Sequence, residues 1–97
     1  MKPGYVYILS NKGRTTFYIG VTSNLCRRLD QHKYEHGSVF TNRYNCHDLL
    51  YYEFHDYIGD AIAREKQLKR WHRQWKINLI KSVNPHMNDL TEEVFNH

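Results

Sequence analysis

The sequence predicts an α/β-class (α+β) domain in which a small three-stranded, mainly antiparallel sheet is flanked by helices. Three short runs rich in β-branched and aromatic residues, at 5–10, 15–21 and 49–54, predict the strands. Two longer segments, at 25–34 and 60–71, carry apolar residues at helical spacing, and a third helix is expected at 73–82. The expected order is therefore β-β-α-β-α-α.

Local signals support each element in turn. The turn-forming residues 11–14 separate the first two strands and predict a hairpin. Residues 22–24 offer several N-cap candidates for the first helix, and the polar segment 37–45 is expected to be a loop. The third helix should end at 83–85, because the residue before Pro85 avoids the α region.

Length and composition limit the class of protein. With 97 residues, the chain suits a single domain over 1–97, with a core of about 4–83 and a C-terminal tail at 84–97. No apolar run approaches the roughly 18 to 20 residues of a membrane span, and the N-terminus does not resemble a secretory signal. Two cysteines are too few for a disulfide framework, so we expect a cytoplasmic protein without membrane association.

Positive charge is concentrated in one segment. The chain has a formal charge of +4, and residues 64–81 hold seven Lys and Arg residues against one acidic residue. With Trp71 and Trp75 nearby, this segment suits a phosphate backbone and stacked bases, although a solvated helix face is the plain alternative. The candidate nucleic-acid-binding residues are Lys66, Lys69, Arg70, Arg73 and Lys76.

Two basic side chains fall on the apolar face of the first predicted helix. At 100° per residue, Arg28 and His32 share a face with Leu25 and Leu29, whereas Arg27 points to solvent. We therefore expect Arg28 and His32 to point toward the sheet.

The second predicted helix carries a carboxylate on its apolar stripe. Glu65 lies among the positions of Ala61 and Leu68, and if the helix continues to Trp75, His72 lies there as well. A charge facing the core costs several kcal/mol unless it is paired or bound to a metal. Glu65 could therefore pair with an arginine such as Arg28 or belong to a functional site.

The strands contribute tyrosines to one side of the sheet. Tyr5 and Tyr7 alternate with apolar residues and share a face of the first strand, and Tyr18 precedes Gly20 on its hairpin partner. Packing is the ordinary role of a buried tyrosine whose hydroxyl finds a carbonyl, and it fits Tyr51 and Tyr52 better than Tyr7 and Tyr18.

Five short segments, in this order and spacing, resemble the signatures of the GIY-YIG nuclease superfamily, in particular its small stand-alone UPF0213 members. The segments are Tyr5-Val6-Tyr7, Tyr18-Ile19-Gly20, the stretch from Asn24 to His32, Ala63-Arg64-Glu65-Lys66, and Asn84-Pro85 with the residues up to Leu90. Tyr5 stands where the name of the superfamily has glycine, and Met87 where the stand-alone members often carry tryptophan.

The resemblance implies a GIY-YIG fold and hydrolysis of DNA phosphodiester bonds with one divalent cation, Mg²⁺ or Mn²⁺. It implies that Glu65 binds the cation and that Arg28 stabilises the phosphate charge, with Gly20 and Asn84 in supporting roles. The general base stays open between Tyr7, Tyr18 and His32. The expected partner is DNA, with branched or damaged DNA and a role in DNA repair in view, and RNA stays open as a substrate.

Two other functions are consistent with the residues. A nucleic-acid-binding module could keep the fold and grip phosphate without cutting. A zinc site could use Cys26, His32, His36 and Cys46, but Cys26 lies about 120° around the helix from His32 and no CxxC pair is present. We therefore expect no zinc.

Overall fold

The computed structural model describes residues 2–34 and 43–96. Its sheet has the strand order β2-β1-β3, with β1 (Gly4–Ser10) between β2 (Phe17–Thr22) and β3 (Asp48–His55). Both strand pairs are antiparallel, so the three-stranded sheet is confirmed and is antiparallel throughout. No helix in the described ranges is long and apolar enough to cross a membrane.

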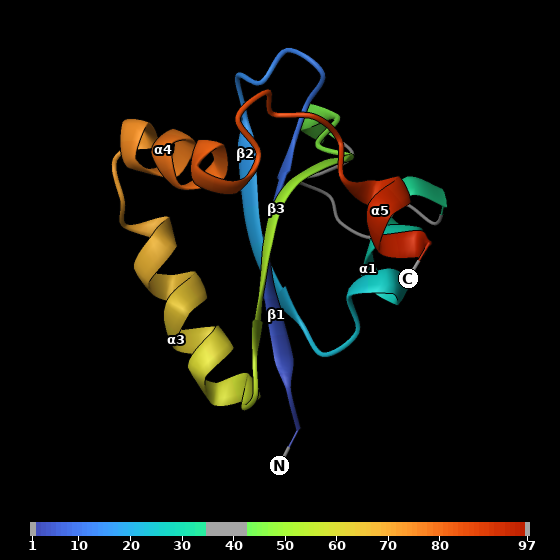
Figure 1. Ribbon diagram of the computed structural model, residues 1–97, viewed down its shortest axis with the longest axis vertical. Coiled ribbons are helices and arrows are strands. Elements are labelled where there is room, and N and C mark those ends of the chain that lie inside the picture. Colours follow the sequence, from blue (N-terminus) through green and yellow to red (C-terminus); the bar gives the residue numbers. More distant parts are fainter. Residues whose placement is uncertain (1, 35–42, 97) are drawn as a thin grey trace.

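Helices cover both faces of this sheet. Two of them, α3 (Ile58–Lys69) and α4 (Arg73–Val83), lie on one side, and α1 (Leu25–Tyr34) lies on the other together with α5 (Thr91–Phe95) (Figure 1). The first helix has the expected bounds. The short helix α5 is an addition to the expected order β-β-α-β-α-α, and it places the C-terminal tail against α1 and the sheet.

Alternation along β1 divides the core into two clusters. Val6 and Ile8 face α3 and α4, where they pack with Leu68 and Ile80. Tyr7 and Leu9 face the opposite way, into a cluster that contains Leu25 and Leu29 of α1. The expected common face of Tyr5 and Tyr7 is confirmed, because Tyr5 packs against this second cluster.

The helix expected at 60–71 both begins and ends two residues earlier, at Ile58 and Lys69. Helix α3 ends at Lys69, and the backbone amides of Arg70 and Trp71 bond to carbonyls three residues back, which closes the helix. The stripe therefore does not continue: His72 is exposed immediately before α4, and Trp75 is 55% exposed. The expectation that His72 lies on a core-facing stripe was wrong for this reason.

The predicted loop at 37–45 lies mostly outside the described residues. Residues 43 and 44, which are described, are helical rather than loop. The loop prediction was wrong for these two positions.

The C-terminal segment completes the outer edge of β3. A β-bulge where β3 pairs with β1 places Leu50 and Tyr51 in the same core cluster. The Leu49 amide donates to Asp89 Oδ1 at 2.9 Å, and its carbonyl accepts from the Leu90 amide at 2.7 Å. Asn84 Nδ2 donates to the Leu50 carbonyl at 3.0 Å, so backbone groups of β3 that face away from β1 are bonded.

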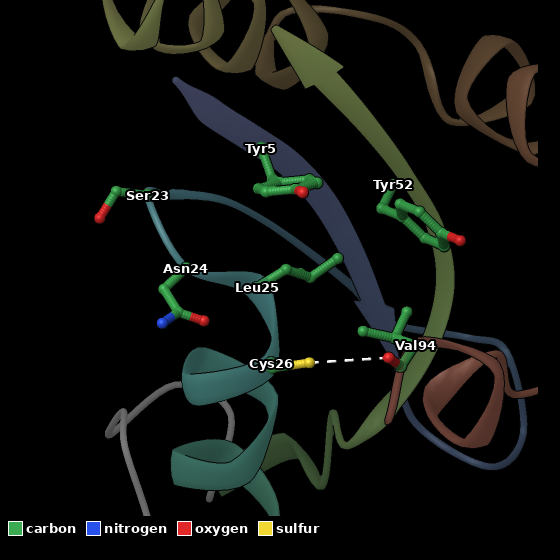
Figure 2. Close-up of a pocket in the computed structure, with 7 residues that line it drawn as sticks. All are labelled: Tyr5, Ser23, Asn24, Leu25, Cys26, Tyr52 and Val94. Atoms are coloured by element: carbon green, nitrogen blue, oxygen red, sulfur yellow. Dashed lines mark hydrogen bonds between the residues drawn. The ribbon is translucent and has the colours of Figure 1, made fainter. Parts of the chain in front are cut away.

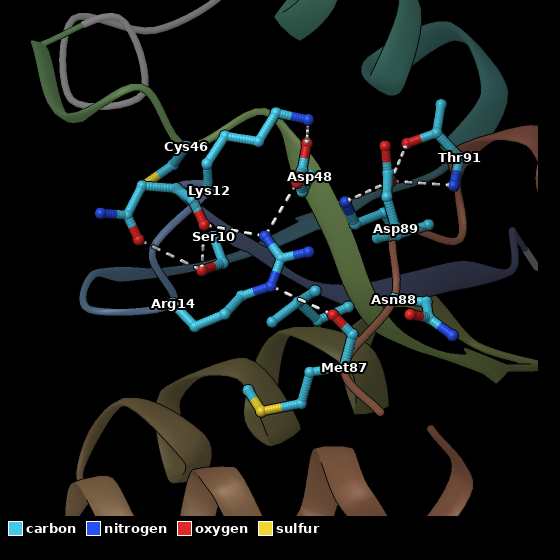
Figure 3. Close-up of polar contacts among 12 residues, drawn as sticks. Ser10, Lys12, Arg14, Cys46, Asp48, Met87, Asn88, Asp89 and Thr91 are labelled. Atoms are coloured by element: carbon cyan, nitrogen blue, oxygen red, sulfur yellow. Dashed lines mark hydrogen bonds and ion pairs between the residues drawn. The ribbon is translucent and has the colours of Figure 1, made fainter. Parts of the chain in front are cut away.

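An ion-pair cluster joins the β1–β2 turn to this segment (Figure 3). Asp48 accepts from Arg14 at 2.8 Å and lies 3.3 Å from the Lys12 ammonium. The Arg14 guanidinium also donates to the Met87 carbonyl at 3.1 Å. Met87 has a positive φ of 51°, a conformation that turns the chain between α4 and α5. The cluster therefore holds three segments that are distant in sequence.

Candidate active site

The centre of the candidate site is Tyr7, whose ring lies against the bare backbone of Gly20. Tyr7 is fully buried on β1 and pairs with Gly20 on β2. A Cβ at Gly20 would lie 2.5 Å from Tyr7 Cζ, closer than any real contact allows. Gly20 is therefore needed here because it leaves room for the Tyr7 ring, not because its φ is unusual.

The second tyrosine of the predicted set lies beside the first. Tyr18 is half-buried on the edge strand β2, and its ring centroid is 6.3 Å from that of Tyr7, with the rings tilted by 42°. Tyr7 and Tyr18 share the α1 side of the sheet. Of the two phenols, Tyr18 is the more accessible to solvent.

The first turn of α1 directs Arg28 toward these rings. Asn24 Oδ1 accepts a hydrogen bond from the Arg27 amide at 3.1 Å and caps the helix, and Thr22 Oγ1 accepts from the Asn24 amide. The half-buried Arg28 side chain lies close enough to Tyr7 to lower the pKa of that phenol, whereas Arg27 is exposed. The predicted orientations of these two arginines are thus confirmed.

Glu65 reaches the same region from the opposite layer. Its side chain on α3 is 15% exposed, and its carboxylate lies 3.3 Å from the Lys69 ammonium on the next helical turn. The ion pair that the structure describes for Glu65 is therefore with Lys69 rather than with Arg28. Its negative charge is close enough to Tyr7 to affect the ionisation of that phenol.

The pKa of Tyr7 brings these contacts together. Burial raises the pKa of Tyr7 well above its ordinary value, and the nearby Tyr18 and Glu65 raise it further, whereas Arg28 lowers it by its charge and hydrogen bond. Burial prevails, so Tyr7 keeps its proton in the free protein. Tyr18 on β2, Arg28 on α1 and Glu65 on α3 are thus each close enough to Tyr7 on β1 to affect its ionisation.

Two other predicted site residues lie differently. His32 belongs by its backbone to the last turns of α1, and its side chain lies outside the described part of the chain. Asn84 is buried at the end of α4, where its amide bonds to the Leu50 and Asn88 carbonyls. Its bonds go to β3 and the C-terminal segment rather than to the tyrosines on β1 and β2.

The candidate nucleic-acid-binding residues do not form one uniform face. Lys66 and Arg70 are exposed on and just after α3, and Lys69 pairs with Glu65. Arg73 stacks over the Phe17 ring at 4.8 Å and donates to the Arg14 carbonyl at 3.0 Å. Lys76 is half-buried on α4. Lys66 and Arg70 are therefore exposed, whereas Lys69 and Arg73 make the contacts given above.

A polar cluster on the α3 side was missed from the sequence. Glu53 on β3 accepts hydrogen bonds from Tyr51 at 2.5 Å and Arg64 at 2.9 Å, and its carboxylate lies 2.8 Å from His55 Nε2. The alternation of residues 51, 53 and 55 on one strand face was the available signal. Burial raises the pKa of Glu53, but its three hydrogen-bond partners outweigh burial, so that the pKa is lowered overall.

The two cysteines considered for a zinc site lie in different surroundings. Cys26 is exposed on α1, 3.6 Å from the Val94 carbonyl, and Cys46 is buried, 3.7 Å from the Thr16 carbonyl. His36 and the His32 side chain lie outside the described residues.

Solvent reaches the candidate site at the first turn of α1. A polar hollow of about 170 Å³ is lined by Arg28 together with Thr22, Ser23, Asn24, Arg27 and Gln31. Arg28 therefore touches Tyr7 on its inner side and an open polar cavity on its outer side.

Comparison with known proteins identifies this arrangement. Residues 3–78 match the GIY-YIG catalytic domain. A UPF0213 protein of Syntrophus aciditrophicus is 35% identical over 82 residues, which cover 84% of this chain and 93% of that protein. A UPF0213 protein of Clostridium perfringens is 36% identical over 78 residues, which cover 80% of this chain and 83% of that protein. No solved structure gives a significant match.

The family match spans the strands and helices that carry Tyr7, Tyr18, Arg28 and Glu65. A GIY-YIG catalytic domain implies a nuclease family and a nucleic-acid substrate. The chain therefore belongs to the GIY-YIG nuclease superfamily, as a small member of its UPF0213 group.

Proposed function

We propose that this protein is a divalent-metal-dependent DNA endonuclease that hydrolyses phosphodiester bonds. The observation that supports this function most directly is the convergence on the buried Tyr7, whose ring contacts Tyr18 and whose ionisation both Arg28 and Glu65 affect. This set provides one cationic, one anionic and two phenolic groups.

The donor set fits one hard cation such as Mg²⁺ or Mn²⁺. Among the side chains that the structure describes, no three His, Cys, Asp or Glu residues gather as a metal cluster, so Glu65 would be a single carboxylate ligand. Magnesium is commonly bound by one or two carboxylates plus phosphate and water. The bound cation supplies Lewis-acid polarisation of the phosphate.

Arg28 binds the scissile phosphate in this mechanism. Its planar guanidinium can donate two parallel hydrogen bonds to phosphate oxygens, and it lines the polar hollow through which a phosphate would approach. Tyr7 holds the guanidinium from behind and keeps its own proton. The fixed positive charge then stabilises the negative charge that develops on the phosphate during the reaction.

Hydrolysis also requires a proton acceptor. As the water oxygen bonds to phosphorus, its proton passes to a base, the ester P–O bond breaks, and the leaving oxygen takes a proton from solvent. Because burial raises the pKa of Tyr7, this phenol keeps its proton and is not free to accept one from water. The role therefore falls to Tyr18, which is half-buried, or to His32 on α1.

The test compares purified wild-type protein with Glu65→Gln and with Glu92→Gln as the matched control. Glu92 is an exposed acid on α5, so its loss removes one negative charge away from the site. Cleavage of a labelled DNA duplex and a branched DNA is measured with Mg²⁺, with Mn²⁺ and with EDTA. An RNA strand of the same sequence tests substrate class.

We expect wild type and Glu92→Gln to cut with either metal, EDTA to stop both, and Glu65→Gln to bind DNA without cutting. Full cleavage by Glu65→Gln would remove Glu65 from its assigned role. Binding without cleavage by wild type under every metal condition would instead favour a non-catalytic binding module.

A further inference from the structure

We propose that the hollow between β1, β3, α5 and the start of α1 accepts one unstacked nucleobase of the bound DNA strand. This inference rests on the proposed function, because it assigns a subsite next to the phosphate-binding Arg28. The hollow measures about 350 Å³. Its lining residues are Tyr5, Ser23, Asn24, Leu25, Cys26, Tyr52 and Val94.

Two tyrosine rings on neighbouring strands form one wall of this hollow. Figure 2 shows Tyr5 on β1 and Tyr52 on β3, across from the first turn of α1. Phe54 packs edge-on against Tyr5, with ring centroids 5.3 Å apart, and the Tyr52 hydroxyl donates to Glu93 at 3.1 Å. Both rings thus contact neighbouring side chains and are only partly buried.

The remaining lining is apolar at the base and polar toward Arg28. Leu25 and Val94 are buried, and the Cys26 thiol is turned to the Val94 carbonyl. Ser23 and Asn24 line both this hollow and the polar hollow at Arg28. The two hollows therefore adjoin at the residues that precede and cap α1.

The spacing along β1 suits a base beside a phosphate on one strand. Tyr5 and Tyr7 lie on the same face two residues apart, a separation of about 7 Å along a β-strand. Tyr7 binds Arg28, and Tyr5 lines the hollow. A nucleotide whose phosphate meets Arg28 can thus place an adjacent base against Tyr5 without stretching the backbone.

The chemistry of the lining selects a flat aromatic group with a polar edge. Aromatic side chains bind nucleobases by stacking, which is tolerant of sequence because every base has a π-face. Among the residues that the structure describes, no Lys, Arg, Asp or Glu side chain lines the hollow, so an uncharged ring suits it better than a phosphate. The expected occupant is therefore a base that has left its stack.

The experiment scans a fluorescently labelled single DNA strand with one abasic position moved along it. Binding is measured by anisotropy in EDTA, so that cleavage plays no part. The proteins are wild type, Tyr5→Leu, which removes the ring but keeps an apolar side chain, and Tyr5→Phe, which keeps the ring. Thermal unfolding of each protein checks that all three are folded.

We expect one abasic position to weaken wild-type binding by about 10-fold, the usual effect of one stacked base. Tyr5→Leu should bind the intact strand about 10-fold more weakly and be insensitive to that position, whereas Tyr5→Phe should behave like wild type. Equal sensitivity of wild type and Tyr5→Leu at every position would overturn the inference.

Parallel cleavage assays with Mg²⁺ separate the two proposals. If the protein cuts DNA but its sensitivity to the abasic position does not depend on Tyr5, the proposed base subsite is wrong and the proposed nuclease function stands. If that sensitivity depends on Tyr5 but no DNA is cut, the base subsite stands and the nuclease function is wrong. Wild-type protein that binds no DNA would overturn both.

Discussion

Gly20 lies directly opposite Tyr7 in the β1–β2 pair, and the Tyr7 ring fills the space where a side chain at residue 20 would begin. The glycine therefore sets the position of Tyr7, and Tyr7 in turn holds the guanidinium of Arg28. The absence of a side chain at residue 20 of the edge strand β2 therefore determines where the Tyr7 ring lies in the candidate site.

Substitution Gly20→Ala should damage both stability and activity. The added methyl group overlaps the Tyr7 ring, so we expect the free energy of unfolding to fall by about 1–3 kcal/mol. Because the ring must move and carry Arg28 with it, DNA cleavage should fall by about 100-fold. Urea unfolding and cleavage assays measure the two effects. Gly13→Ala is the control: its Cβ would meet only Thr15 Cγ2, at 3.9 Å, and should change stability by less than about 0.5 kcal/mol.

Arg14 and Lys12 should differ sharply in their effect on stability, although both pair with Asp48. The Arg14 side chain is 24% exposed and also bonds to the Met87 carbonyl, whereas the Lys12 side chain is 87% exposed. We expect Arg14→Met to lower the free energy of unfolding by about 1–3 kcal/mol, because it leaves buried acceptors without their donor. Lys12→Met should change it by less than about 0.5 kcal/mol. Equal losses in urea unfolding would contradict this assignment.

Stability should fall at high pH through the buried tyrosines. Burial, together with the hydrogen bond to Glu53 and its charge, raises the pKa of Tyr51 from 10.0 to about 12. Between these values the unfolded chain releases a proton that the folded state keeps, so raising the pH favours unfolding. Urea unfolding from about pH 9 to about pH 12 should show a decline that is shallower in Tyr51→Phe, by up to about 1.4 kcal/mol per pH unit. Identical slopes would mean that Tyr51 does not contribute.

The Glu53 cluster should act in the opposite pH range. Hydrogen bonds from Tyr51, His55 and Arg64 keep the pKa of Glu53 below its ordinary value of 4.5, despite burial that raises it. The resulting stabilisation is present above that pH and is lost as the pH falls below it. Glu53→Gln should therefore be less stable than wild type at neutral pH, and the difference in unfolding free energy should shrink in acid. Glu92→Gln, an exposed control, should show no such convergence.

Elements with local signals could be predicted from the sequence. Alternation along β1 placed Tyr5 and Tyr7 on one face, and the N-cap candidates at 22–24, of which Asn24 makes the cap, placed the start of α1; both predictions were confirmed. The break between α3 and α4 was expected near residue 72, but α3 ends at Lys69 rather than at Trp71, because hydrogen bonds from the Arg70 and Trp71 amides close the helix earlier. Helix α5 was missed because its start depends on Asp89, which bonds to Thr91 and to Leu49 on β3.

The candidate site could be predicted in part for the same reason. The angular positions of residues on a helix were enough to predict that Arg28 points toward the sheet. The strand pattern was enough to predict that Tyr7 and Tyr18 lie on paired strands. Spacing places Lys69 one helical turn after Glu65, but spacing alone does not decide between Lys69 and a distant arginine such as Arg28 as the partner. Arg64, counted with the basic segment, bonds instead to Glu53 on a strand distant in sequence.

The bonds from Asn84, Asp89 and Leu90 to β3 have a consequence for self-association. An edge strand with bare amide and carbonyl groups is a template on which another copy of the chain can add its own strand. Here the tail occupies that template at Leu49 and Leu50. The segment after α4 thus blocks the pairing of another strand with this part of β3. A protein truncated before Asn84 should therefore be more prone to oligomerise through β3.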